Sequence, residues 1–286
     1  MRKVVTIIML ISSLNSYSQD SSAYKKRLNW VRYGGLAAYT VGMIGLNEVW
    51  YSQSPRTSFH FFNDVAEWKQ TDKTGHFFNA FQLSSITYQA LTWAGSNKRK
   101  RALASSLIGL GLISSIEIFD GFSPDYGASV FDVAANASGC LLFLGQMTTW
   151  KEIRIYPKYS FSTSGLAKQN PSLLGSTITQ QVIKDYNGQT VWLSMDIDKF
   201  TRFPKWLNLA IGYGAQNMVK ARDQENKLLG YHPYRQYYLS FDVDIKAIKT
   251  KSKFLKSVIY FVNMIKLPAP TLELSQGKWK GHLLYF

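Results

Sequence analysis

The chain has 286 residues, a formal net charge of +15, and contents of 46% hydrophobic and 15% aromatic residues. This apolar content suffices for a large core, and the length allows two domains. The only cysteine, Cys140, excludes an internal disulfide, and its apolar surroundings predict a small core residue.

The first residues have the pattern of a secretory signal peptide. Two basic residues precede an apolar run over residues 4–14, and serines stand at the cleavage positions within residues 16–18. We therefore expect residues 1–18 to be a signal peptide and the mature chain to begin near Gln19. The apolar run is too short to span a bilayer. No cysteine lies near the cleavage site, so we expect no lipid attachment there.

Four apolar stretches follow, over residues 30–51, 77–95, 102–119 and 131–150. Each is near the ~20 residues that a spanning helix needs, but each also contains Gly, Ser, Thr or Asn. Tryptophan and tyrosine residues stand at several of the stretch ends, as is typical of membrane interfaces. The pattern predicts a four-helix bundle that is embedded in a membrane. The alternative is a water-soluble bundle that rests on one.

Acidic and amide residues interrupt these stretches at helical spacing. They read Asp72-Lys73-x-x-His76, Glu117-x-x-Asp120 and Asp132-x-x-x-Asn136. Residues three or four apart lie on one helix face. A carboxylate in an apolar segment costs several kcal/mol unless it is paired, hydrogen-bonded or metal-bound. We therefore predict one polar cluster, whose members are Asp72, Lys73, His76, Glu117, Asp120, Asp132 and Asn136.

This cluster has two interpretations. It is either a structural lock within the bundle or a site that binds a divalent metal and acts on an envelope lipid or cell-wall substrate. In the second case the candidate ligands are His76, Glu117, Asp120 and Asp132, and oxygen ligands with one histidine suit Mg, Mn, Ca or Zn. The sequence contains no HExxH, P-loop or GxSxG motif. We therefore favour the non-enzymatic lock.

After residue 150 the hydrophobic pattern changes from helical to alternating, which indicates half-buried antiparallel strands. The alternating segments lie around residues 153–162, 193–198, 207–213 and 239–245, and the chain ends in a short apolar segment with a terminal aromatic residue. Helical spacing over residues 254–265 predicts one late helix. Five or six strands are fewer than the eight of a minimal membrane barrel, which remains the alternative.

These patterns together predict an α+β fold. A helical, membrane-associated domain over residues 19–150 precedes a mostly antiparallel β domain over residues 151–286. Within the second domain, Leu-Ser-Met-Asp-Ile-Asp at 193–198 recurs as Leu-Ser-Phe-Asp-Val-Asp at 239–244. Paired carboxylates on one strand face can bind a cation. We expect them instead to form the solvent-facing side of a sheet.

The positive charge is concentrated in the second domain. Residues 151–286 carry 20 basic and 9 acidic side chains, whereas residues 19–150 carry 11 and 9. A basic half of an exported protein favours membrane lipid or lipopolysaccharide as a partner and makes nucleic acid an unsuitable one. An envelope protein partner and a merely solvated basic surface are the alternatives. We expect the protein in the cell envelope, at the outer membrane or the periplasmic face.

The three polar motifs, together with Gly121-Phe122-Ser123 and Gly139, resemble those of the YfiM-like family of predicted periplasmic lipoproteins. They are more distantly similar to VanZ-like membrane proteins. The resemblance covers roughly residues 65–146, and the C-terminal half resembles the longer members found in Bacteroidota. It implies an envelope location and no established reaction. Because a lipidation cysteine is missing, we expect anchoring by apolar helices instead of an acyl chain.

Overall fold

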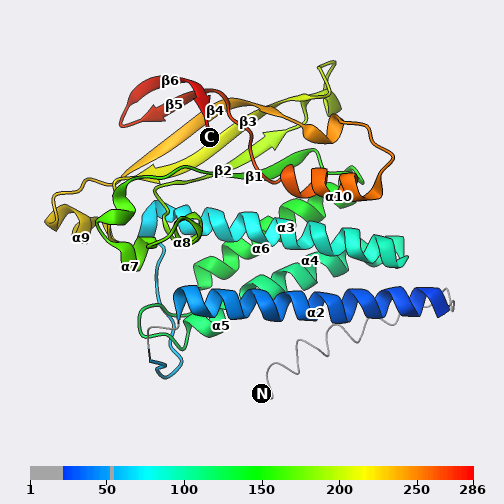
Figure 1. The fold of residues 1–286 in the computed structure, drawn as a ribbon, viewed down its shortest axis with the longest axis horizontal. Helices are drawn as coiled ribbons and strands as arrows, with labels where there is room; N and C mark the ends of the chain where they lie inside the picture. The colour runs from blue at the N-terminus through cyan, green and yellow to red at the C-terminus, as the bar shows by residue number, and fades with distance from the viewer. Residues whose placement is uncertain (1–21, 52–54) are drawn as a thin grey trace. The chain divides into compact units, whose positions relative to one another are not determined.

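The structure, a computed structural model, describes residues 22–51 and 55–286. The predicted signal peptide, residues 1–18, lies outside the described residues. Helices occupy the N-terminal half, and a six-stranded antiparallel sheet with a late helix follows them (Figure 1). The α+β prediction is therefore confirmed.

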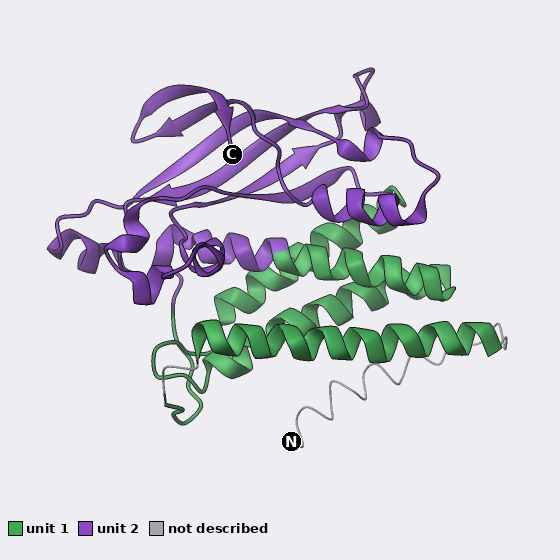
Figure 2. Ribbon diagram, viewed as in Figure 1, with its two compact units in different colours: residues 1–63, 79–151 green, residues 64–78, 152–286 purple. Residues whose placement is uncertain are grey.

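The chain divides into two compact units (Figure 2). Unit 1 consists of residues 1–63 and 79–151, and unit 2 of residues 64–78 and 152–286. The short segment 64–78 thus groups with the C-terminal sheet, although a long helical stretch separates the two in the sequence.

The helices of the N-terminal half follow the four predicted stretches. They are α2 (Ser22–Trp50), α3 (Thr71–Ala94), α4 (Lys98–Ser114), the short α5 (Ile116–Asp120) and α6 (Val130–Thr149). Side-chain caps set two of the starts, because Asn97 accepts from the Arg99 N–H and Ser129 from the Asp132 N–H. Two helical stretches, Lys98–Asp120 and Val130–Thr149, are long and apolar enough to cross a membrane, a test that core helices of water-soluble proteins also pass.

Unit 1 has a small apolar core in which its helices approach closely. Ala80, Ile113 and Cys140 are buried together, which confirms the prediction for the cysteine. A Cβ on Gly109 would lie 2.6 Å from the Ser84 Oγ, so only glycine fits between α3 and α4 at this level.

Unit 2 is built on six strands, each hydrogen-bonded to the next. They are β1 (Ile155–Phe161), β2 (Gln189–Met195), β3 (Leu207–Gln216), β4 (Tyr234–Val243), β5 (Ala269–Ser275) and β6 (Lys278–Tyr285). The connections contain η2 (Leu166–Lys168), α7 (Pro171–Leu174), α8 (Ile178–Lys184), η3 (Ile197–Lys199), α9 (Asp223–Leu228), η4 (Ile245–Ala247) and α10 (Lys253–Val262). The predicted strands and the late helix are therefore present.

The first edge of the sheet is also bonded to the chain that follows α10. The Tyr159 N–H donates to the Met264 carbonyl at 2.8 Å, and the Lys266 N–H donates to the Tyr159 carbonyl at 2.9 Å. These bonds form a parallel bridge between Tyr159 and Ile265. The segment that leads into β5 thus returns to β1 and covers its edge.

The sheet is strongly curled. In a flat sheet, strands lie about 4.8 Å apart, so β1 and β4 would be separated by about 14 Å and β2 and β6 by about 19 Å. Instead, the Lys158 Nζ on β1 lies 2.6 Å from Asp242 on β4. The Thr190 hydroxyl on β2 lies 3.4 Å from the Tyr285 hydroxyl on β6. The sheet therefore closes around the face that carries these side chains, which we call the inner face.

The inner face carries the buried polar residues, whereas the opposite, outer face is apolar. The outer face is exposed over β3, β4 and β5, but it is covered at Pro157 on β1 and Val191 on β2. On the inner face, Lys158, Asn208 and Asp242 are at most 1% exposed. On the outer face, Ile211 is 58% and Leu239 is 47% exposed. The exposed apolar side chains of this face are Met195, Leu209, Ile211, Tyr237, Leu239, Phe241, Leu272 and Trp279.

The repeated Asp-containing segments therefore do not form the solvent-facing side of the sheet, and that prediction is wrong. Asp196, Asp242 and Asp244 are buried, and Asp198 is half-buried in η3. The physical reason is that alternation shows only that the two faces of a strand differ. Which face is covered depends on how the sheet curls, and here it curls around the polar side.

Candidate functional site

The predicted polar residues divide between the two units: Asp72, Lys73 and His76 in unit 2, and Glu117, Asp120, Asp132 and Asn136 in unit 1. The first set joins segment 64–78 to the rest of unit 2. Asp72 accepts a hydrogen bond from the Tyr186 hydroxyl at 2.6 Å, and Lys73 contacts Asp72 at 3.0 Å and Asp64 at 2.6 Å. The His76 Nε2 lies 3.9 Å from Asp72.

The electrostatic surroundings of Asp72 keep it ionised. Burial alone would raise the pKa of this carboxyl, but the neighbouring His76 and Lys73 and the Tyr186 hydroxyl together lower it. Beside this carboxylate, the buried Trp68 ring packs 5.1 Å from the Tyr186 ring. Segment 64–78 is thus held to the rest of unit 2 by the Tyr186–Asp72 hydrogen bond and the Trp68–Tyr186 ring contact, while the ion pairs of Lys73 and His76 lie within the segment.

The second set stabilises turns and helix ends within unit 1. The Glu117 Oε2 accepts from the Ser129 N–H at 3.0 Å, and the Ser129 hydroxyl caps α6 at the Asp132 N–H. The Asn136 side chain donates to the Ser114 hydroxyl at 3.3 Å, and Asp120 accepts from the Tyr51 hydroxyl at 2.6 Å. Helix ends leave backbone N–H groups without intrahelical partners, and the Glu117 and Ser129 bonds supply such partners.

Hydrogen bonds or ion pairs within the same unit account for the side chains of Asp72, Lys73, Glu117, Asp120 and Asn136. The proposals of a bound divalent metal and of an enzyme that uses His76, Glu117, Asp120 and Asp132 stay predictions.

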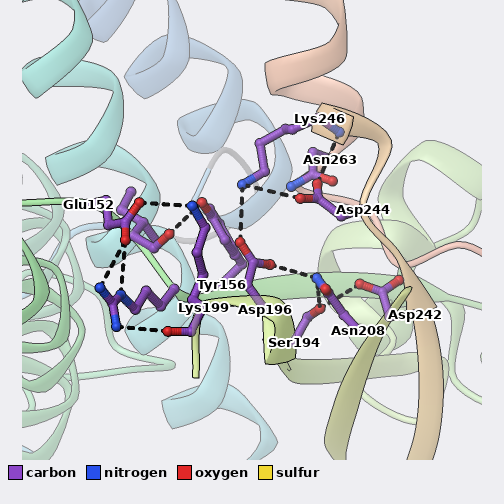
Figure 3. Close-up of polar contacts among 12 residues, drawn as sticks. Glu152, Tyr156, Ser194, Asp196, Lys199, Asn208, Asp242, Asp244, Lys246 and Asn263 are labelled. Atoms are coloured by element: carbon purple, nitrogen blue, oxygen red, sulfur yellow. Dashed lines mark hydrogen bonds and ion pairs between the residues drawn. The ribbon is translucent and has the colours of Figure 1, made fainter. Parts of the chain in front are cut away.

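The inner face of the curled sheet holds a second group of charged residues, which we call the inner cluster. Its members are Tyr156, Lys158, Ser194, Asp196, Asn208, Asp242, Asp244, Lys246, Asn263 and Lys266. Figure 3 shows most of them converging from neighbouring strands and from η4. Three lysines and three aspartates balance in formal charge, so the cluster has no net preference for an anion or a cation.

Lys158 is the centre of one half of the inner cluster. Its ammonium group lies 2.6 Å from the Asp242 Oδ2 and donates to Asn263 at 3.2 Å and to the Val243 carbonyl at 3.3 Å. The Ser194 hydroxyl also donates to the Asp242 Oδ2, at 2.6 Å. A charged pair out of water is stable only when further hydrogen bonds surround it, and these contacts meet that condition.

Asp196 and Lys246 form the other half. Asp196 accepts from the Asn208 amide at 2.7 Å, and the Lys246 Nζ lies 4.0 Å from Asp196 and 3.8 Å from Asp244. Burial raises the pKa of Asp196 to about 6, and the neighbouring Asp244 adds to this rise, whereas Lys246 opposes it. The Lys246 ammonium also stands 3.3 Å from the centre of the Tyr156 ring.

Lys266 is the third lysine of the inner cluster. It is fully buried, and its ammonium lies 4.5 Å from the centre of the Trp192 ring and donates to the Leu267 carbonyl at 3.1 Å. Burial lowers its pKa to about 8, although Asp242 opposes the change. The Trp192 indole is itself fixed by donating to the Ser160 hydroxyl at 2.9 Å.

A further polar group fills the inner face near its last strands. Glu273, which is 2% exposed, accepts from Gln236 at 2.9 Å and from Ser275 at 2.6 Å, and lies 2.8 Å from the His282 Nε2. These hydrogen bonds lower the pKa of Glu273 against the opposing effect of burial. Polar groups therefore occupy both ends of the inner face, and the buried cluster of Trp192, Ala210 and Tyr238 lies between them.

Two buried oxygens of the inner cluster are exceptions. The Asn208 Oδ1 and the Asp242 Oδ1 have no hydrogen-bond partner among the described residues. They belong to residues that face each other directly on β3 and β4. Buried polar oxygens of this kind are the usual partners of internal water.

Sequence reasoning did not find most of the inner cluster. It singled out the aspartates of the repeat but missed Lys158, Asn208, Lys246 and Lys266. A signal was available in β1, where Arg154, Tyr156, Lys158 and Ser160 occupy alternate positions in the same way as the polar residues of the repeat.

The fold and the inner cluster define an α+β protein whose curled sheet buries charged residues on its inner face and carries apolar residues on its outer face. Residues 59–144 match a family model described as predicted periplasmic lipoprotein (DUF2279), so the helical half is similar to that family. The curated proteins and the solved structures gave no match to this chain. The description is consistent with the expected cell-envelope location. The one cysteine, Cys140, is buried in unit 1.

Proposed function

We propose that this chain is an exported, membrane-associated cell-envelope protein whose sheet places its outer face against lipid. The observation that carries the proposal is the reversal of the two faces of the sheet. The charged residues Lys158 and Asp242 are buried, whereas the apolar residues Ile211, Leu239 and Phe241 are between 46% and 58% exposed.

Lipid is the environment in which this reversal is favourable. Contiguous exposed apolar surface is disfavoured in water, and each Å² moved out of water stabilises by roughly 25 cal/mol. Strands that face a bilayer alternate apolar residues toward lipid with polar residues toward the interior. β3 and β4, with 10 residues each, fall within the roughly 9–11 residues of a membrane-crossing strand.

The polar clusters act as structural locks in this proposal. Inside the curled sheet, a network such as that of Lys158, Asp242 and Ser194 specifies one packing, because each member depends on the others for its hydrogen bonds. The contacts of Asp72 and Lys73 serve the same purpose for segment 64–78. The described residues around the inner cluster include no serine or cysteine nucleophile paired with a histidine.

The proposal also specifies the membrane that the protein contacts and the family that it resembles. The basic C-terminal half and the envelope location favour the outer membrane, with its lipopolysaccharide, as the surface that the protein contacts. The likeness to YfiM-like proteins, with the more distant VanZ-like order of motifs, is consistent with this place. An envelope protein partner for the basic half is the alternative.

Site-directed spin labelling tests the lipid contact directly. Single cysteines replace Ile211, Leu239 or, as a control, Leu228 in a Cys140→Ala background, and the full chain is reconstituted into phospholipid vesicles. Leu228 lies on α9, away from the sheet, and is 83% exposed. We expect labels at 211 and 239 to be accessible to oxygen and shielded from a water-soluble nickel chelate, with the opposite result at 228. Equal access of the nickel chelate to all three labels would contradict the proposal.

A further inference from the structure

Helix α10 and the loop before it form a second surface with the character of a membrane-binding element. Residues 245–272 contain six lysines and no acidic residue. Two of the lysines, Lys246 and Lys266, belong to the inner cluster. The remaining four are exposed, and they are Lys249, Lys251, Lys253 and Lys256. The exposed lysines gather at the amino end of the helix.

The apolar residues of α10 form one exposed stripe. Phe254, Val258, Phe261 and Val262, with Ile265 just beyond the end of the helix, recur at the spacing of a single helix face. Each is at least 37% exposed, and Phe254 is 79% exposed. No residue of α10 is buried. In a water-soluble domain such a stripe packs against the core, whereas here its side chains are exposed.

The positive charge of this segment favours the binding of an external anion. Four lysines close together repel one another, and the amino end of a helix is the positive end of its dipole. The only side-chain cap there is the neutral Ser252, which accepts from the Leu255 N–H at 3.3 Å. A basic helix with an exposed apolar stripe is the usual form of an element that binds a lipid surface.

We infer that α10 and its preceding loop bind anionic lipid in a bilayer, with the lysines on the headgroup phosphates and the apolar stripe against acyl chains. This inference rests on the proposed membrane function and specifies the class of lipid. The lipid contact of α10 differs from that of the outer sheet face. An apolar sheet face does not distinguish anionic from zwitterionic lipid, whereas the lysines before and in α10 do.

The test is a competition between two vesicle populations of different density, one of phosphatidylcholine and one of phosphatidylcholine mixed with phosphatidylglycerol. The full chain in mild detergent is mixed with both, the detergent is removed, and the vesicles are separated by flotation. The test variant carries Lys249→Gln, Lys251→Gln, Lys253→Gln and Lys256→Gln. The control variant removes the same charge at four other exposed lysines, by Lys205→Gln, Lys220→Gln, Lys227→Gln and Lys278→Gln.

We expect the natural chain to prefer the anionic vesicles. The α10 variant should lose that preference by about 20-fold or more, because each lysine near an anionic surface contributes about fivefold and two of the four already account for that loss. The control variant should keep most of it. A Phe254→Ser, Phe261→Ser variant should also associate less with anionic vesicles. Far-ultraviolet circular dichroism of each variant confirms that the fold is kept.

The outcomes separate this inference from the proposed function. If the natural chain floats with both populations equally, or if the α10 and control variants behave alike, the α10 inference is wrong and the sheet contact stands. If the natural chain floats with neither population, the proposed membrane function itself is wrong.

Discussion

The Lys158 ammonium on β1 lies 2.6 Å from the Asp242 carboxylate on β4, and both side chains are at most 1% exposed. Two strands separate these residues in the sheet. The pair therefore bridges the curled sheet across its interior, and it ties together segments that are far apart in the sequence.

Asp242→Asn should destabilise the chain strongly. The substitution leaves the Lys158 charge buried without a counter-charge, which costs about 3–5 kcal/mol in typical buried pairs. Urea unfolding followed by tryptophan fluorescence measures the effect. Glu152→Gln is the matched control, because Glu152 pairs with Lys199 and the two side chains are 39% and 36% exposed. Exposed pairs contribute about 0–1 kcal/mol, so an equal effect of the two substitutions would refute the bridging role.

The positions of the strands could be predicted from the sequence, but the burial of their faces could not. Alternation in Leu239, Ser240, Phe241 and Asp242 identifies a strand with two unlike faces. The same pattern suits a sheet in water with polar residues outward and a sheet in lipid with polar residues inward. The choice depends on curvature, which arises from contacts such as that between Thr190 and Tyr285.

For the candidate sites, the sequence indicates which residues need partners but not which partners they have. The spacing of Asp72 and His76 marks residues that need partners, because a charge near apolar residues is costly without them. Their partner Tyr186 lies more than a hundred residues away, and nothing in the local pattern indicates it. Local patterns report which residues need partners, whereas tertiary structure decides which partners they find.

Asp196 should make the stability of the chain depend on pH in the acid range. Its pKa is raised from 3.8 to about 6 in the folded state, so the folded chain holds a proton there that the unfolded chain has released. The resulting stability is present below pH 3.8 and is lost as the pH rises through about 6, by an amount on the order of 2 kcal/mol. Urea unfolding of the natural chain and of Asp196→Asn at several pH values measures it. The difference between the two free energies of unfolding should change between pH 4 and 7, and a constant difference would contradict the prediction.

Tyr186→Phe should loosen segment 64–78 without unfolding the sheet. The tyrosine hydroxyl donates to the ionised Asp72, and hydrogen bonds to charged groups contribute roughly 1.5–3 kcal/mol. Amide hydrogen exchange should therefore speed up in residues 64–78 and stay unchanged in β3. Tyr237→Phe is the control, because Tyr237 is 51% exposed on the outer face. Unchanged exchange in segment 64–78 would show that the contact with Asp72 does not hold it.

His76→Ala separates the lock from the metal interpretation. In the lock interpretation the substitution lowers thermal stability, because Asp72 loses a neighbour that helps to keep it ionised. Elemental analysis of the natural chain and of the variant, each purified from cell envelopes, should then find no stoichiometric divalent metal in either. Stoichiometric metal in the natural chain that is lost in the variant would favour the alternative of a metal-dependent enzyme.

Gly212→Ala should destabilise unit 2 because the inner face has no room for one more methyl group. An added Cβ at Gly212 would lie 2.6 Å from the Trp192 ring, and that ring is fully buried and anchored by Ser160. Overpacking of this kind costs about 1–3 kcal/mol, since the ring must move against its neighbours. Gly281→Ala on β6 is the matched control, because nothing lies within 4 Å of an added Cβ there. Urea unfolding should show a loss of stability at 212 and little change or a small gain at 281. A variant at 212 as stable as the natural chain would mean that the interior of the sheet is looser than its contacts indicate.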